Sequence, residues 1–147
     1  MSETGGNPEE RVRALKARGQ IERDLGHRDE ALRLYEEALA ICRAGDDPFA
    51  LAHTVRHVGD IHREAGRGDL ALTCYVEALA IYRANERTRP LDLANAIRPL
   101  AILKEQAGDA DEARRLWEEA QDLYAAANVS QGVAESDRRL ERLGQPS

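Results

Sequence analysis

The sequence is poor in the residues that mark several kinds of fold and site. It has two cysteines, one tryptophan and one phenylalanine, and aromatic residues make up only 4% of the chain. So few aromatics, beside 42% hydrophobic and 33% charged residues, favour a helical protein over a β-sandwich or a disordered segment. Since neither Cys42 nor Cys74 belongs to a CxxC pair, we expect both to be small buried hydrophobic residues.

Positive charge and long apolar runs are also lacking. The net charge of -6 disfavours non-specific binding to nucleic acid or to an anionic membrane, because both need a surplus of positive charge. No stretch approaches the roughly 18 apolar residues of a membrane-spanning helix. The first residues, MSETGGNPEER, have no basic start followed by an apolar core, as a secretory signal would. We therefore predict a cytoplasmic protein with no nucleic-acid or membrane partner.

What the chain does contain is an internal repeat. DEALRLYEEALAIC at 29–42 aligns with DLALTCYVEALAIY at 69–82 and DEARRLWEEAQDLY at 111–124, at offsets of 40 and 42 residues. A step of 7 keeps two small residues on one helix face, and a step of 12 across a turn places a third on the next helix. Each unit is therefore predicted to be a closely packed helix hairpin. The glycines of the turns are Gly26, Gly66 and Gly108, and the small residues stand at 19, 31 and 38, at 59, 71 and 78, and at 101, 113 and 120.

Prolines and capping residues predict where the helices begin. Pro8, Pro48 and Pro90 each open the first helix of a hairpin, and Asn7 and Asp47 can act as caps. Pro99 lies inside a predicted helix, where it removes a backbone hydrogen bond; it causes either a bend accommodated by packing or a change in the shape of a groove. The predicted helices span roughly 8–25, 28–44, 48–65, 68–86, 90–107, 110–127 and 131–143.

The pattern of small and aromatic residues from Pro8 to Leu143 resembles the tetratricopeptide repeat family. In each repeat an aromatic residue follows an alanine by four positions, as in Ala31 and Tyr35. The period is longer than the usual 34 or so residues and resembles the extended repeats of kinesin light chains and related bacterial proteins. The remaining alanine and aromatic pairs are Ala71 with Tyr75 and Ala113 with Trp117, while the usual first-helix aromatics are replaced by Leu15, Val55 and Ile97 and by Glu22, His62 and Lys104.

The resemblance implies an all-α superhelix, a solenoid of three helix hairpins closed by a C-terminal capping helix. One domain would span 8–143, with repeats at about 8–44, 48–86 and 90–127 and the capping helix at about 131–143. Residues 1–7 and 144–147 would be flexible ends. In function, the resemblance implies a protein–protein interaction scaffold that binds a peptide segment in the concave groove lined by the first helix of each hairpin.

A helical wheel at about 100° per residue predicts which side chains face that groove. Lys16, Arg56 and Arg98 share one column, so each repeat contributes a cation. This local surplus of positive charge predicts a protein or peptide ligand with acidic groups, although an arginine-rich composition would also place cations there. The complete set of predicted groove residues is Arg13, Lys16, Gln20, Arg23, His53, Arg56, His57, Asp60, Arg63, Asn95, Arg98 and Ile102.

The stretch HTVRHVGDIHRE, residues 53–64, contains three of the four histidines. His53 and His57 are four residues apart, and Asp60 is near enough to complete a metal site, but a polar groove accounts for the same residues. We predict neither a metal nor another cofactor. If the groove binds anions, protonation of these imidazoles near their ordinary pKa of about 6.5 would tighten binding at mildly acidic pH. His62 falls on the opposite, packing side of the helix.

Motifs of catalysis are missing from the sequence. It has no glycine-rich phosphate loop after a strand, no nucleophile elbow and no isolated carboxylate pair in an apolar setting. We therefore predict no enzymatic activity and no catalytic residues. The alternative to a peptide-binding scaffold is a structural or assembly module that self-associates through its terminal helices, and the expected state is a monomer or a weak homodimer.

Overall fold

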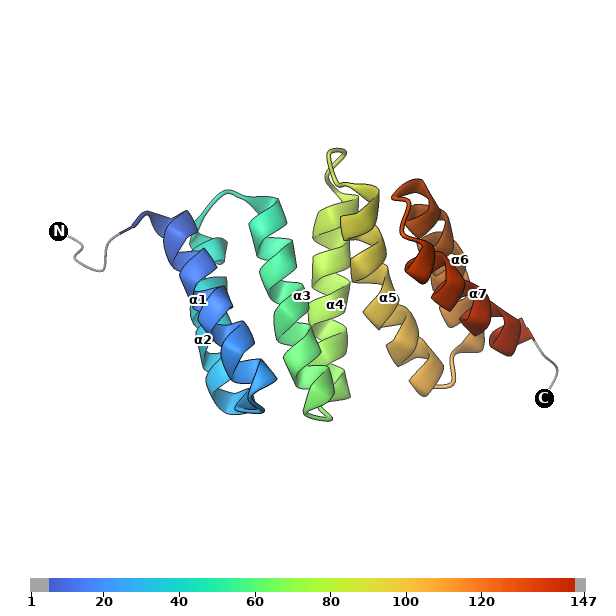
Figure 1. Ribbon diagram of the computed structural model, residues 1–147, viewed down its shortest axis with the longest axis horizontal. Helices are drawn as coiled ribbons and strands as arrows, with labels where there is room; N and C mark the ends of the chain where they lie inside the picture. The colour runs from blue at the N-terminus through green and yellow to red at the C-terminus, as the bar shows by residue number, and fades with distance from the viewer. Residues whose placement is uncertain (1–5, 145–147) are drawn as a thin grey trace. The chain divides into compact units, whose positions relative to one another are not determined.

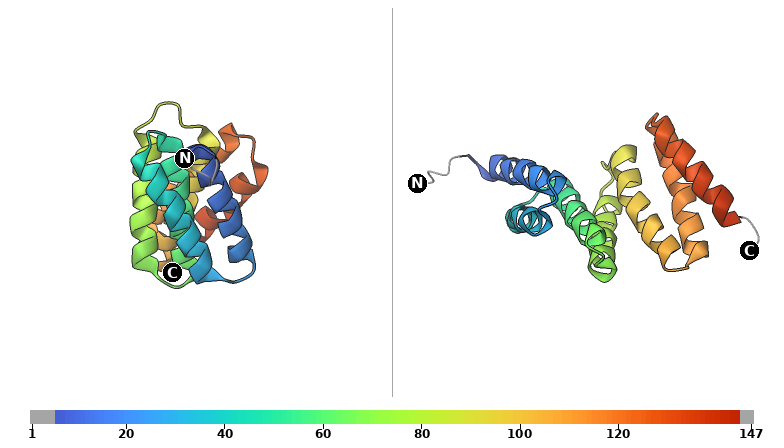
Figure 2. Two further views of the ribbon diagram at one scale, coloured as in Figure 1. Left: turned by 90° about the vertical axis from the view of Figure 1, so that its left-hand side faces the viewer. Right: turned by 60° about the horizontal axis from the view of Figure 1, so that its bottom comes forward.

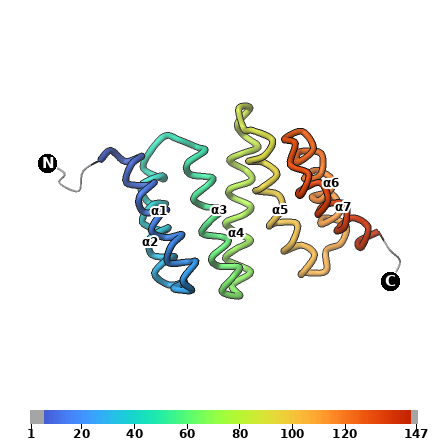
Figure 3. The backbone as a smooth tube through the Cα atoms, in the orientation of Figure 1, coloured from blue at the N-terminus to red at the C-terminus, as the bar shows by residue number. Residues whose placement is uncertain are grey.

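The computed structural model describes residues 6–144, and this part of the chain is all-α. The predicted helices are confirmed to within a few residues; the largest difference is α4, expected to reach residue 86 but ending at Arg83. The flexible ends predicted at 1–7 and 144–147 lie largely outside the described residues. The helices, shown in Figures 1 and 3, are α1 (Pro8–Asp24), α2 (Arg28–Ala44), α3 (Pro48–Glu64), α4 (Gly68–Arg83), α5 (Pro90–Gln106), α6 (Ala110–Ala126) and α7 (Ser130–Gly144).

The chain divides into two compact units, and the boundary falls inside α4. Unit 1 is Met1–Cys74 and unit 2 is Tyr75–Ser147. Within unit 1, α2 packs against both α1 and α3; within unit 2, α6 packs against both α5 and α7. Figure 2 shows these helix hairpins from two further sides.

Local sequence signals explain where the helices begin and end. The Asn7 side chain accepts a hydrogen bond from the backbone N–H of Glu10, whose own side chain accepts one from the backbone N–H of Asn7, which forms a capping box at the start of α1. Asp47 caps α3 in the same region of the next hairpin. The turns inside the hairpins contain Gly26, Gly66 and Gly108 at φ values of 84°, 79° and 82°, a left-handed conformation that glycine adopts without strain.

The small residues allow adjacent helices to approach closely, as their spacing predicts. A Cβ atom on Gly19 would lie 2.8 Å from a ring carbon of Tyr35, and a Cβ on Gly132 would overlap the ring of Tyr124. Both aromatic rings therefore pack directly on the backbone of the neighbouring helix. The alanines of the repeat are 0% exposed: Ala31, Ala38, Ala71, Ala78, Ala101, Ala113 and Ala120.

The cores of the units contain the residues expected there. Leu15, Val55 and Ile97, which replace the aromatics of the resemblance, are buried. Cys42 is buried as predicted and Cys74 is half-buried. Pro99 lies inside α5, which continues through it, and its ring is buried in the packing. None of the described helices is long and apolar enough to cross a membrane.

Candidate functional site

Three helices of unit 1 bring a group of polar side chains together on the inner side of α1 and α3. Most of the groove residues predicted in the first two hairpins belong to it, and α2 adds an aromatic ring beneath them. We call this group the unit 1 cluster: Lys16, Gln20 and Arg23 from α1, Tyr35 from α2, and His53, Arg56, His57, Asp60, Arg63 and Glu64 from α3.

A chain of hydrogen bonds connects α1 to the two histidines. Lys16 Nζ lies 2.6 Å from His53 Nδ1, and His53 Nε2 lies 3.3 Å from His57 Nε2. Because the Lys16 ammonium is a donor only, His53 Nδ1 accepts and His53 carries its proton on Nε2. That proton is donated to His57 Nε2, which leaves the His57 proton on Nδ1. The His57 ring also stacks on Tyr35, with ring centroids 5.5 Å apart and planes inclined by 17°.

His57 stays neutral in this setting. Burial lowers its pKa from 6.5 to about 2, and the nearby charge of Arg56 adds to this effect, followed by His53, Lys16 and Arg23. The expected tightening of anion binding through His57 at mildly acidic pH is therefore wrong, because this ring takes up no proton there. Burial also lowers the pKa of Lys16, with the charge of Arg56 acting in the same direction.

Positive charge exceeds negative charge in the unit 1 cluster. Glu64 is held by the guanidinium of Arg23, with 3.0 Å between Arg23 Nε and Glu64 Oε1. Asp60 is 3.9 Å from Arg56 Nη1 and 3.7 Å from Arg63 Nη2, contacts longer than hydrogen bonds. The unit 1 cluster thus contains four cations, Lys16, Arg23, Arg56 and Arg63, and two carboxylates, Asp60 and Glu64, and Lys16 is hydrogen-bonded to His53 instead of a carboxylate.

Two buried donors in the same place have no hydrogen-bond acceptor. These are His57 Nδ1 and Arg63 Nε. A buried polar group without a partner is uncommon in folded proteins, since it costs about 1–3 kcal/mol. The unit 1 cluster therefore has more donors and more positive charge than the chain itself satisfies.

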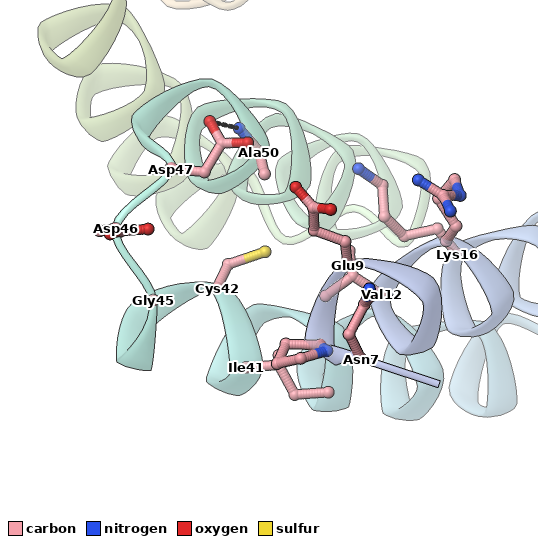
Figure 4. Close-up of a pocket in the computed structure, with 12 residues that line it drawn as sticks. Asn7, Glu9, Val12, Lys16, Ile41, Cys42, Gly45, Asp46, Asp47 and Ala50 are labelled. Atoms are coloured by element: carbon pink, nitrogen blue, oxygen red, sulfur yellow. Dashed lines mark hydrogen bonds between the residues drawn. The ribbon is translucent and has the colours of Figure 1, made fainter. Parts of the chain in front are cut away.

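A pocket of about 470 Å³ opens beside the unit 1 cluster, between the first turns of α1 and α3 and the last turn of α2 (Figure 4). Arg13 and Lys16 contribute its basic side, and Val12, Ile41 and Ala50 contribute apolar surface. Lys16 thus borders both the pocket and the unit 1 cluster. The remaining lining residues are Asn7, Pro8, Glu9, Cys42, Gly45, Asp46 and Asp47.

Unit 2 holds the third cation of the predicted column in a different way. The guanidinium of Arg98 donates two hydrogen bonds to Glu135 of α7, at 2.6 and 2.9 Å. Glu105 likewise accepts hydrogen bonds from Arg139 and Arg142 at 3.0 and 3.3 Å, and from the indole of Trp117. Each of these cations therefore has a carboxylate partner within the chain.

Sequence reasoning did not identify Glu135 as the partner of Arg98. The signal was present: Arg98 precedes Glu135 by 37 residues, as Lys16 precedes His53 by 37. Extending the groove columns into the last helix would have placed an acid opposite this cation. Asn95, also predicted to line the groove, accepts a hydrogen bond of 2.9 Å from the hydroxyl of Tyr124.

Two residues of one predicted groove column are buried, although Gln20 in the same column is half-buried. Asp60 is 7% exposed and Ile102, at the same position of the next hairpin, is 8% exposed. The wheel placed this column among the polar groove positions, but it lies at the edge where the helix meets its neighbour. Ile102 is therefore a core residue and is removed from the set of accessible groove positions.

The histidines do not converge on one centre. His53 and His57 meet with ring centroids 4.4 Å apart, whereas His62 is buried on the packing side and accepts a hydrogen bond of 3.0 Å from Arg67. Within residues 6–144, no group of three or more His, Cys, Asp or Glu side chains is placed to hold a metal ion.

Comparison with solved structures shows the same fold in proteins of low sequence identity. BtubC from P. vanneervenii has a TM-score of 0.71 at 18% identity, with 97% of this chain and 68% of that chain covered. The Rap conjugation gene regulator of plasmid pLS20, in complex with the Phr* peptide, has a TM-score of 0.70 at 15% identity, with 85% of this chain but only 34% of that chain covered. PcrH from Pseudomonas aeruginosa has a TM-score of 0.67 at 22% identity, with 99% and 100% covered.

Comparison with family models identifies the family of the chain. The comparison with curated proteins finds no match. Two models described as tetratricopeptide repeat match residues 12–44 and 49–126, and the second match alone covers more than half of the chain. The chain therefore belongs to the tetratricopeptide repeat family of protein-interaction scaffolds.

Proposed function

We propose that unit 1 binds a peptide segment of a partner protein through a carboxylate, without catalysing a reaction. The observation that carries this proposal is the charge of the unit 1 cluster, which has four cations and two carboxylates on a chain of net charge -6. Half-buried arginine and lysine side chains form strong charge-assisted hydrogen bonds with carboxylates, and a ligand carboxylate would balance the local surplus.

The candidate binding groups are the cations that the chain holds least firmly. Arg56 has only the long contact of 3.9 Å to Asp60, and Lys16 donates to a neutral imidazole instead of an acid. Exchanging an imidazole for a carboxylate as the acceptor strengthens the hydrogen bond of the ammonium. We therefore assign the ligand carboxylate to Lys16 and Arg56, with Arg13 beside the neighbouring pocket as a further contact.

Unit 2 has no corresponding role in this proposal. Arg98 already holds Glu135 through two hydrogen bonds, so a ligand would have to displace an acid of the same chain. The predicted column of three cations is thus reduced to Lys16 and Arg56. The pairing of Arg98 within the chain accounts for this side of unit 2 without a ligand.

A solved neighbour makes peptide binding a reasonable expectation for this fold. The Rap regulator was solved in complex with the Phr* peptide, and this chain is similar to about a third of it. The 15% identity carries no binding residues over. The acidic character of the ligand is inferred only from the unit 1 cluster, and a cytoplasmic site of action and the lack of a cofactor stay predictions from the sequence.

Selection from a peptide library tests this proposal. The full chain is immobilised, a library of random peptides is selected on it, and the bound peptides are sequenced and measured by calorimetry. We expect enrichment of Asp and Glu, and a loss of affinity of about tenfold or more for Arg56→Gln. Arg33→Gln, an exposed site on α2 of the same unit, is the matched control and should bind like the wild type. Bound peptides without acidic residues, or unchanged affinity in Arg56→Gln, would contradict the proposal.

A further inference from the structure

Two large apolar side chains are exposed at the C-terminal end of the first helix. Ile21 on α1 is 56% exposed, and Leu25, the residue that caps α1, is 62% exposed. Ile61 stands at the position of Ile21 in the next hairpin and is 0% exposed, because α2 covers it in a cluster that includes Tyr35 and Val58. No described helix covers the same face of α1. We call this surface the α1 outer face: Ala14, Ala17, Arg18, Ile21 and Leu25.

The last helix differs from the first in this respect. Asp137 and Glu141 of α7 are exposed and stand where α3 has the buried residues Val55 and Gly59. The outward side of α7 is thus suited to water, as expected of a terminal repeat that closes a core. Of the two terminal helices, only α1 presents an apolar outward face.

The charged side chains around the α1 outer face are positive toward one end of the helix and negative toward the other. Arg11 and Arg13 lie toward its N-terminal end, and Glu22 and Asp24 lie toward its C-terminal end. On a wheel of about 100° per residue, Arg11 and Glu22 flank one side of Ile21, while Arg13 and Asp24 flank the other. A second α1 in antiparallel orientation therefore meets opposite charges on both flanks, whereas a parallel one meets like charges.

The same antiparallel register matches the apolar residues by size. Pairing Arg11 with Glu22 centres the two-fold axis between Lys16 and Ala17, and pairing Arg13 with Asp24 centres it between Arg18 and Gly19. The register midway between them, centred between Ala17 and Arg18, leaves each pair of opposite charges offset by two residues, about 3 Å along the helix axis, which long arginine side chains span. Ile21 then lies opposite Ala14 of the other copy, and a large side chain enters the space left by a small one. Glu22 and Asp24 already accept hydrogen bonds from His27 and Gln20 at their own surface, but each carboxylate has further acceptor positions.

We propose that the α1 outer face is the interface of an antiparallel homodimer in which each copy contributes the same surface. Two-fold symmetric dimers are the commonest assemblies of soluble chains, and a self-complementary charge pattern is what such an interface requires. The inference does not depend on the unit 1 cluster, because it rests on the outward side of α1; Arg13 is the one residue that both proposals use.

Sedimentation velocity of the full chain across the micromolar range tests the proposal. We expect a concentration-dependent equilibrium between monomer and dimer, and a monomer throughout for Ile21→Glu with Leu25→Glu. Val76→Glu is the matched control, because Val76 is 51% exposed on α4, and its dimer should match that of the wild type. A wild-type monomer at every concentration would overturn the proposal, and so would a dimer that survives the double substitution.

A charge exchange tests the orientation. Arg11→Glu should raise the dimer dissociation constant about tenfold, because each dimer contains the contact twice. Adding Glu22→Arg restores opposite charges in the antiparallel register and should return the constant to near the wild-type value. Circular dichroism checks that each variant is folded. If the double variant dimerises no better than Arg11→Glu, the antiparallel interface is wrong.

Discussion

Lys16 on α1 and His53 on α3 are joined by a contact of 2.6 Å between Nζ and Nδ1, a cation held by a neutral ring where unit 2 has an acid. The corresponding residue pair in unit 2, Arg98 and Glu135, is fully charged and doubly hydrogen-bonded. The two units have a similar arrangement of helices but differ in charge. Unit 1 has a surplus of positive charge around Lys16, whereas the positive charge of Arg98 in unit 2 is neutralised by Glu135.

The neutral state of His57 predicts a loss of stability on mild acidification. The unfolded chain takes up a proton on this residue as the pH falls through 6.5, whereas the folded chain does so only near a pKa of about 2. Lowering the pH from about 7 to about 5 should therefore reduce the free energy of unfolding by about 2 kcal/mol through His57 alone. Urea denaturation at a series of pH values measures the slope.

His57→Gln is the control for this prediction. The variant should show a shallower decrease of stability between about pH 7 and pH 5, because the titrating ring is gone. Hydrogen bonds from Arg23 and Arg98 lower the pKa values of Glu64 and Glu135 below 4.5. The protonation of these carboxylates therefore affects the stability of the fold only at lower pH. Equal slopes in the wild type and the variant would show that His57 is accessible to protons in the folded chain.

The close approach of helices at Gly19 and Gly132 predicts a steric penalty for any side chain. Alanine favours a helix over glycine, yet Gly19→Ala and Gly132→Ala should each lower the free energy of unfolding by about 1–3 kcal/mol, since the added Cβ meets an aromatic ring. Gly68→Ala is the matched control, because nothing lies within 4 Å of its Cβ position. In thermal denaturation, Gly68→Ala should unfold at or above the temperature of the wild type, and Gly19→Ala and Gly132→Ala below it. If Gly19→Ala and Gly132→Ala were more stable than the wild type, the packing described would be wrong.

The ion pair between Arg98 and Glu135 predicts an energetic coupling between α5 and α7. A double-mutant cycle with Arg98→Gln and Glu135→Gln should give a coupling of about 1 kcal/mol in urea denaturation, a value limited by solvent screening because the Arg98 side chain is 39% exposed. The exposed pair Arg33 and Glu30 on α2 should give a smaller coupling. Additive effects of the two substitutions would mean that α7 is held by its other contacts alone.

The helices and turns could be predicted because their signals are local. The left-handed conformation of Gly26, the cap at Asn7 and the spacing from Gly19 to Ala31 each depend on a few neighbouring residues. A helical wheel then separates the two sides of a helix correctly for His53 and His62.

The electrostatics of the site could not be predicted in the same way. The neutrality of His57 depends on burial by Tyr35 of another helix, and the pairing of Arg98 depends on Glu135, which is 37 residues away. Ile102 shows the limit of the wheel itself, because the width of a buried face is set by the neighbouring helix and not by the periodicity. The residue types showed which side chains can donate hydrogen bonds. The packing of the helices determines which of these donors already have an acceptor within the chain.

In the proposed complex, Lys16 and Arg56 of unit 1, and not Arg98 of unit 2, receive the carboxylate of a peptide ligand. NMR titration of the isotope-labelled chain with a library-selected acidic peptide, beside the same peptide with Asp and Glu replaced by Asn and Gln, tests it most directly. We predict saturable shift changes at Lys16, Arg56 and their neighbours, little change around Arg98 and Glu135, and weak effects from the amide peptide. Shift changes centred on Arg98, or equal binding of the two peptides, would contradict the account.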